Sequence, residues 1–173
     1  YFLLSKIIER VTDKSYESNV QELIFNPLGL KNSFPYISNS IDNLAHPIID
    51  KQDLQEYPKR ANNAISQGSG NIVSDIYDLN KFIRALLVEK TLLKPESLKL
   101  MSEFKGNQKS KLGLGLFEKT YSEKVFWGHS GRQVSYITYA FVDLKTGHSI
   151  VVINNNANDE IVDTVFEKLC AQP

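Results

Sequence analysis

The chain has 173 residues and a mass of 19.6 kDa, and 42% of its residues are apolar, which is enough for one domain with its own core. Only 23% of the residues are charged, so the composition excludes a disordered, solvated chain. The 20 basic residues balance the 20 acidic ones and form no Lys/Arg stripe, which argues against nucleic acid or an anionic membrane surface as a partner. No apolar stretch approaches the roughly 20 residues that a membrane helix needs.

The cysteine and histidine content argues against a metal site. Cys170 is the only cysteine, so the chain can form neither an internal disulfide nor a multi-cysteine zinc site. The three histidines, His46, His129 and His148, are scattered, and no His-Glu-x-x-His pattern occurs. We therefore expect no metal.

Helical patterns dominate the start of the chain. Apolar residues at spacings of three and four predict a helix over residues 1–12. Ser15 is placed to cap a second helix, which Pro27 and Gly29 end. Residues 31–66 are rich in Asn, Ser, Pro and Asp without a clear period, which indicates long irregular connections.

Two more helices are expected before the pattern changes. Ser74 or Asp75 is placed to cap the first of them. Its apolar side carries Leu79, Phe82, Ile83, Leu86 and Leu87. Pro95 fits the first turn of the second, because proline lacks only an N–H that is unpaired there.

After Gly106 the period becomes that of strands. Strands are expected near residues 112–118, 124–129, 135–144 and 148–155, followed by a terminal helix that begins with Asp159 and Glu160. The sequence thus predicts an α+β fold, in which an antiparallel sheet of three to four C-terminal strands with a flanking C-terminal helix follows a mostly helical region. We place the boundary between a helical region over residues 1–105 and a sheet region over residues 106–173.

A glycine-rich segment, Gly68-Ser69-Gly70, is similar to half of a phosphate-binding loop. No strand precedes it and the third glycine is missing, so a dinucleotide site is a poor interpretation. A loop that leads into a helix cap is the better one. No cofactor is predicted.

The segment Gly128-His129-Ser130-Gly131 places a titratable ring and a hydroxyl between two glycines at the end of an aromatic strand. One interpretation is a nucleophile elbow of the Gly-x-Ser-x-Gly kind, but Arg132 stands where the last glycine belongs, and a strand follows where that motif requires a helix. The other is a tight turn whose histidine is merely a partly exposed polar residue. Taken without context, the residues favour the turn.

Context comes from five segments in a fixed order. They are residues 1–16, residues 24–30 with the sequence Ile-Phe-Asn-Pro-Leu-Gly-Leu, residues 68–82 with Gly-Ser-Gly-Asn-Ile-Val-Ser and Asp-Leu, the pair 112–115 and 127–131, and residues 150–155. In this order they resemble the serine β-lactamase and penicillin-binding-protein-like hydrolases of the class C type, including their esterase and D-amino-acid peptidase relatives. The Pro-Leu-Gly-Leu match is the most specific.

The resemblance implies roles for four residues. His129, Ser130 and Gly131 would form the family's third catalytic box, with His129 near the acyl pocket and the hydroxyl of Ser130 offered to a substrate carboxylate. The backbone N–H of Arg132 would supply one of two oxyanion-hole donors. Gly131 also has a physical reason, because a residue without Cβ lets a substrate lie close to the strand.

One tripeptide of the same family stands in a different context. Lys145-Thr146-Gly147 spells a third box of penicillin-recognising enzymes, but it lies between two predicted strands and is followed by His148. We interpret it as a hairpin turn.

The family's Ser-x-x-Lys and Tyr-x-Asn boxes have no counterpart in a fitting context. Ser102 to Lys105 spells the first, but it follows the helical region instead of opening it. The chain begins at Tyr1 inside a helical pattern, so we expect a C-terminal part whose nucleophile lies in an upstream segment of the same protein. We also expect this part alone to be inactive, and to leave an apolar face open for that upstream segment.

Two functions follow from the resemblance. The favoured one is the C-terminal part of a serine acyl hydrolase that acts on an ester, a β-lactam or a D-amino-acid peptide. The alternative is a catalytically inactive relative that uses the same cleft as a binding module. An exported or envelope-associated location in a bacterium is implied by the resemblance only.

Overall fold

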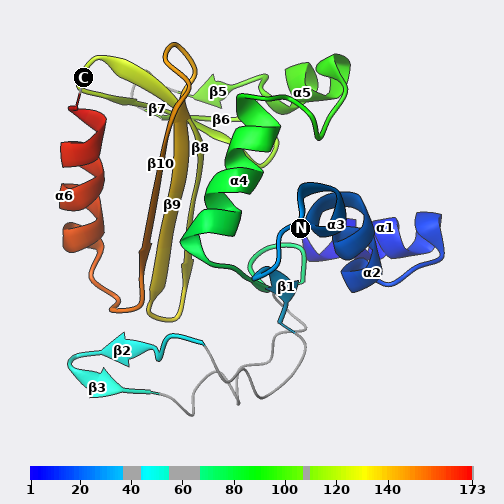
Figure 1. Cartoon of the computed structure of the whole chain (residues 1–173), viewed down its shortest axis with the longest axis horizontal. Coiled ribbons are helices and arrows are strands. Elements are labelled where there is room, and N and C mark those ends of the chain that lie inside the picture. The colour runs from blue at the N-terminus through cyan, green and yellow to red at the C-terminus, as the bar shows by residue number, and fades with distance from the viewer. Residues whose placement is uncertain (37–43, 55–66, 107–109, 173) are drawn as a thin grey trace.

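A six-stranded antiparallel sheet lies at the centre of the protein, in a computed structural model that describes residues 1–36, 44–54, 67–106 and 110–172 (Figure 1). Its strands follow the order β10-β9-β8-β7-β6-β5. In chain order they are β5 (Lys105–Gly106), β6 (Ser110–Leu112), β7 (Phe117–Tyr121), β8 (Lys124–Gln133), β9 (Tyr136–Asp143) and β10 (His148–Asn154). The predicted α+β class is confirmed.

Helices make up most of the first hundred residues. They are α1 (Phe2–Thr12), α2 (Tyr16–Val20), the π-helical turn η1 (Gln21–Phe25), α3 (Asn26–Leu28), α4 (Ile76–Leu87) and α5 (Pro95–Met101). Two small ribbons lie among them, in which β1 (Phe34–Pro35) pairs with β4 (Ile72–Val73) and β2 (Ile48–Ile49) pairs with β3 (Gln52–Asp53). The last helix is α6 (Asp159–Cys170).

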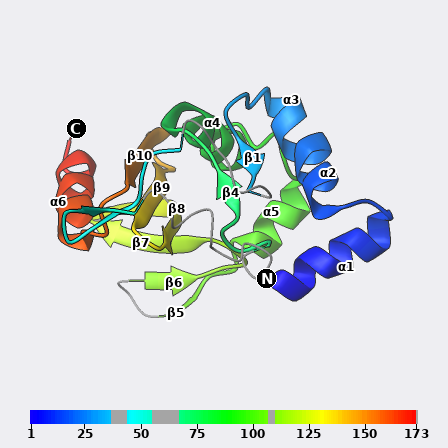
Figure 2. The ribbon, with the colours of Figure 1, turned by 90° about the horizontal axis from the view of Figure 1, so that it is seen from below.

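The sheet has one core on each face, because α4 and α6 pack on opposite sides of β9 and β10 (Figures 1 and 2). The α4 core contains Ile83, Leu86, Leu87, Leu98, Leu116, Ala140 and Val142. The α6 core contains Phe126, Phe141, Ile150, Phe166 and Cys170. Alternation along β9 explains the division, since neighbouring residues such as Phe141 and Val142 point to opposite faces.

Helices α1 to α3 lie beside this sheet and not on it (Figure 2). Along α1 only Ser5 is buried, whereas Leu3, Leu4, Ile7 and Val11 are each more than half exposed. An amphipathic helix of this kind gains stability mainly by burying its apolar side. The described residues leave the apolar side of α1 uncovered.

Local signals located several elements correctly. The Ser15 hydroxyl accepts the N–H of Ser18 at the start of α2, and Asp75 accepts the N–H of Asp78 at the start of α4. Gly29 ends α3 in the left-handed conformation. The irregular region predicted for residues 31–66 contains only β1, β2 and β3 where it is described, while residues 37–43 and 55–66 lie outside the described part.

The strand predictions need three corrections. Residues 112–118 are not one strand, because Gly113 donates its N–H to the Leu116 carbonyl and Gly115 has a φ of 73°, so the chain reverses between β6 and β7. The sheet also has six strands, not three to four, because β5 and β6 are only two and three residues long and too short to show a period.

The third correction concerns the glycine-flanked segment at 128–131. It is not a tight turn, and the strand does not end at residue 129, because β8 continues to Gln133. Pairing with β9 decides this, since His129 lies opposite Ala140 and Gly131 opposite Thr138. By contrast, residues 145–147 form the predicted turn between β9 and β10, with a hydrogen bond of 2.8 Å from the Gly147 N–H to the Asp143 carbonyl.

Candidate active site

The segment predicted to carry the site lies on the half of β8 that is paired on one side only. Strand β7 pairs with β8 only from Lys124 to Gly128, because Phe117, the first residue of β7, lies opposite Gly128. Strand β9 pairs with β8 further, up to Gln133 opposite Tyr136. Within the described residues, the stretch from residue 129 to 133 therefore forms a free edge of the sheet.

The register tells which peptide groups point out of this free edge. Two-residue loops join Tyr121 to Lys124 and Gln133 to Tyr136, and the residues that flank such a loop form a hydrogen-bonded pair. The N–H and C=O of Gln133 therefore face β9, as do those of every second residue before it. The N–H and C=O of Ser130 and Arg132 face the other way, toward the side that β7 has left open.

Gly131 leaves open space beside this edge. A Cβ on Gly131 would meet no atom of the described residues within 4 Å. On Gly128, only three residues earlier, it would lie 2.0 Å from the Ala140 carbonyl oxygen and 2.6 Å from the Phe141 Cα. Gly128 is therefore required for packing, whereas in the described part of the fold no contact requires glycine at position 131.

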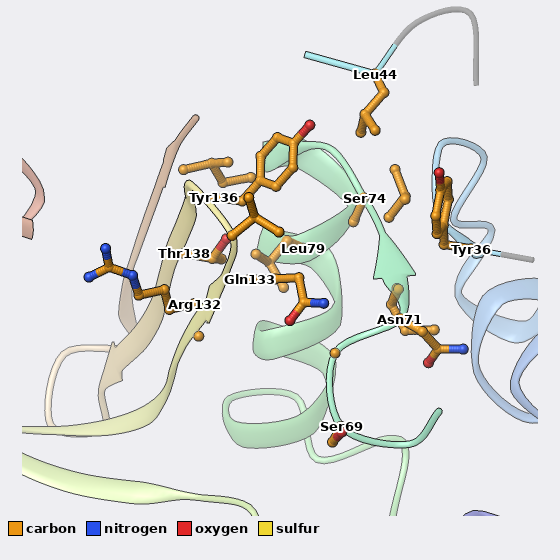
Figure 3. A pocket seen from close by; sticks show the side chains of 16 residues that line it. Tyr36, Leu44, Ser69, Asn71, Ser74, Leu79, Arg132, Gln133, Tyr136 and Thr138 are labelled. Atoms are coloured by element: carbon orange, nitrogen blue, oxygen red, sulfur yellow. The ribbon is translucent and has the colours of Figure 1, made fainter. Parts of the chain in front are cut away.

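A cavity of about 330 Å³ adjoins Gly131 on the α4 side of the sheet (Figure 3). One wall comes from the end of β8, the following hairpin, β9 and β10, and the other from the segment that leads through β4 into α4. The lining residues are Tyr36, Leu44, Ser69, Gly70, Asn71, Ile72, Val73, Ser74, Leu79, Gly131, Arg132, Gln133, Val134, Tyr136, Thr138 and Ile153. Six of these residues are aliphatic, six are polar or charged, and Arg132 is the one charged residue among them.

The Arg132 side chain is directed away from the cavity (Figure 3). Its guanidinium forms an ion pair with Asp159 in the first turn of α6 and also contacts the Ala157 carbonyl. Arg132 therefore brings its backbone, not its charge, to the cavity.

His129 and Ser130 are not among the residues that line this cavity. The imidazole of His129 instead stacks on Phe117, the first residue of β7, with ring centroids 4.6 Å apart and planes inclined by 32°. Desolvation lowers the pKa of the His129 imidazole below its usual value, a backbone hydrogen bond at Ser130 opposes this shift, and the charge of Lys119 adds to it. The environment of the ring thus favours its neutral form.

The cavity also contains residues that sequence reasoning missed. Tyr36, Asn71 and Tyr136 come from three separate segments. Burial raises the pKa of Tyr136 to about 12, and its hydroxyl donates a hydrogen bond of 2.5 Å to the Ala45 carbonyl. Only Asn71 has a local signal in the sequence, since it follows the glycine-rich segment Gly68-Ser69-Gly70, for which the sequence predicts a loop.

Two other candidates from the sequence do not form a site. Ser102 ends α5 and Lys105 begins β5, so the Ser-x-x-Lys spelling does not place both side chains on one helix. In the part of the chain that the structure describes, no three His, Cys, Asp or Glu residues are grouped to hold a metal ion.

Among the described helices, none is both long and apolar enough to cross a bilayer.

Comparison with known proteins identifies the fold. The family model described as Beta-lactamase matches residues 1–167. A D-stereospecific amidohydrolase from Streptomyces sp. superimposes with a TM-score of 0.82 at 24% identity, over 98% of this chain and 52% of its own.

Two other structures extend the comparison. The D-amino acid amidase from Ochrobactrum anthropi SV3, complexed with D-phenylalanine, gives a TM-score of 0.75 at 26% identity over 96% of this chain and 58% of its own. A Beta-Lactamase/D-Alanine Carboxypeptidase from Pseudomonas syringae gives 0.76 at 15% identity, over 99% of this chain and 58% of its own. The chain thus spans little more than half the length of these proteins.

Proposed function

The chain belongs to the Beta-lactamase family, and on that premise we propose that it is the C-terminal part of a serine hydrolase that cleaves an ester, a β-lactam or a D-amino-acid amide through an acyl-enzyme. The observation that carries the proposal is the free edge of β8. There the Arg132 N–H points away from β9, next to the open space at Gly131. A strand edge with an unused N–H beside a cavity is what an oxyanion hole requires.

Each residue of the segment has a role in this proposal. Gly131 lets the substrate approach the strand, and the Arg132 N–H stabilises the negative charge on the carbonyl oxygen during acyl transfer. His129 and Ser130 lie on the neighbouring part of the same edge, where the Ser130 hydroxyl is offered to the substrate. One such N–H donor typically contributes a factor of about 10² to 10³ in rate.

The substrate follows from the relatives only as a class. The amidohydrolase and the amidase are both named for D-amino acid or D-stereospecific chemistry. We therefore place amides of D-amino acids first among the substrates to be tested, followed by β-lactams and simple esters. By the family resemblance alone, we place the protein in the envelope or outside the cell of a bacterium.

The proposal requires an upstream segment of the same protein that brings the nucleophilic serine and its lysine. Two exposed features support such a partner. The first is the apolar side of α1, where Leu3 and Val11 are 74% and 78% exposed. The second is β10, which pairs only with β9 among the described strands and so has a free outer edge.

A covalent probe tests the overall proposal. We expect a fluorescent penicillin or phosphonate to label the protein when the upstream segment is present, and to leave the isolated 173-residue chain unlabelled. Labelling should disappear when the upstream serine is replaced by alanine. If no acyl probe labels the protein when its upstream segment is present, the protein is an inactive binding module instead.

Two substitutions at one position test the role of the Arg132 N–H. Arg132→Pro removes the N–H and should slow acylation by about 10²- to 10³-fold, while Arg132→Ala keeps it and should react at nearly the normal rate. The fold tolerates proline here because this N–H does not pair with β9. Equal rates for the two variants would exclude Arg132 from the oxyanion hole.

Gly131→Val tests the approach of the substrate. The added side chain fills open space and should slow acylation without loss of stability. Thr120→Val is the matched control, since Thr120 is exposed on β7 and does not line the cavity.

A further inference from the structure

His129 is held by residues of the neighbouring strand. Phe117 pairs with Gly128, the residue before His129, and its ring lies where β7 ends and the free edge of β8 begins. The tilted stack at 4.6 Å covers one face of the imidazole, although the residue as a whole remains exposed. The orientation of His129 therefore depends on Phe117.

Lys119, two residues along β7, brings a positive charge to the same place. Its Nζ lies 5.8 Å from the centre of the Phe117 ring, 5.3 Å from that of Tyr139 and 5.4 Å from that of Phe141. Contact of an ammonium group with aromatic rings is attractive and fixes its position. Phe117 thus stacks on the imidazole and lies beside the ammonium group.

The other described charged groups near this cluster, Asp163 and Glu118, have hydrogen-bond partners of their own. Asp163 of α6 accepts a hydrogen bond of 2.6 Å from the Tyr139 hydroxyl and attracts Lys119. Glu118 of β7 binds Lys111 and the Trp127 ring N–H, and Trp127 packs in the α4 core. Among the described residues, Lys119 is the charge that shifts the pKa of the imidazole, which it lowers.

From these contacts we infer that Phe117 and Lys119 are positioning residues, which hold the His129 imidazole against the end of β7 at the free edge of β8. The role of this arrangement in turnover rests on the proposed function, whereas the arrangement itself does not. An uncharged imidazole keeps a nitrogen lone pair and can accept a proton from a reacting group. A protonated one cannot.

The consequence for pH has a definite sign. Since the pKa of His129 is lowered in the folded chain, the unfolded chain binds more protons as the pH falls through about 6.5. The folded state is then favoured above pH 6.5 and loses stability below it. A hydrolase that needs the neutral ring should lose activity on the same acidic side.

NMR titration of the 173-residue chain tests the inference without any catalysis. The chain has three histidines, so His129→Gln identifies the signal of His129, and His46 and His148 serve as internal references. Lys119→Met removes the charge at similar length and should raise the pKa of His129. Lys119→Arg keeps the charge and should leave it unchanged. Phe117→Ala uncovers the ring and should move the pKa toward about 6.5.

The inference is overturned if Lys119→Met and Lys119→Arg leave the His129 titration equally unchanged. Should Phe117→Ala fail to fold, the lysine pair still decides, because Lys119 lies only partly buried on the sheet surface. In the protein with its upstream segment, Lys119→Met should also shift the acidic limb of the pH–rate profile to higher pH. The two proposals can also fail separately. If the His129 titration shifts in Lys119→Met but no acyl probe labels the protein with its upstream segment, the proposed function is rejected and the positioning role is kept.

Discussion

The two halves of β8 have the same strand geometry and the same neighbour, β9, but differ in what lies on the other side. The first half, from Lys124 to Gly128, also pairs with β7 and contributes Phe126 to the α6 core. The second half, from residue 129 to 133, has no second neighbour among the described strands and adjoins the cavity. The loss of one neighbouring strand thus turns a structural segment into one whose backbone is available to a ligand.

The glycines make the same point. Gly128 and Gly131 are three residues apart and look equivalent in the sequence, yet one is enclosed by β9 and the other faces open space. A glycine in a strand can therefore serve packing or ligand access, and only its surroundings tell which.

The largest effect is expected in the core of the paired half. Phe126 is 2% exposed and packs against Phe166, so Phe126→Ala should reduce the free energy of unfolding by about 4 kcal/mol. Urea denaturation measures this change. Val125→Ala on the same strand, where the side chain is 45% exposed, is the control and should cost under about 1 kcal/mol. Equal losses at both positions would contradict the assignment of the core.

A smaller effect separates the two glycines. Gly128→Ala forces a methyl group against the backbone of β9 and should cost about 3 kcal/mol in unfolding free energy. Gly131→Ala should stay within about 0.5 kcal/mol of the parent chain. If both substitutions destabilise the chain equally in urea, the second half of β8 is enclosed and the comparison fails.

Proline substitutions test which peptide groups are paired. Gln133→Pro removes an N–H that faces β9 and should cost about 2 kcal/mol in unfolding free energy. Arg132→Pro removes one that faces the free edge and should cost under about 1 kcal/mol, part of it from the exposed ion pair with Asp159. Arg132→Ala measures that part separately. The opposite ranking of the two prolines would mean that the N–H directions are reversed.

The smallest expected effect is a gain. Val134, in the hairpin that follows the free half, has a φ of 56°, which is costly for a β-branched residue. Val134→Gly should raise the free energy of unfolding by about 1 kcal/mol, detected as a higher melting temperature. Val125→Gly, at a strand position without positive φ, should lower it by about 0.5 to 1 kcal/mol. A loss at position 134 would show that the hairpin carries no strain.

The sequence by itself determined the features that depend on neighbouring residues. The caps at Ser15 and Asp75, the end of α3 at Gly29 and the turn at residues 145–147 all follow from local side-chain chemistry and backbone preference. The order of the motifs also sufficed to identify the Beta-lactamase family and the α+β class. None of these required a contact between distant parts of the chain.

Only the tertiary structure decided the form of the candidate site. The segment from Gly128 to Gly131 has the composition of a turn, and it is a strand because β9 pairs with it. Tyr36 and Asn71 reach the cavity from segments about 60 to 100 residues before Gly131, which no periodicity in the sequence connects to it. The physical reason is the same in each case, since hydrogen bonds and packing between distant segments outweigh local propensity when they bury apolar surface and satisfy the backbone.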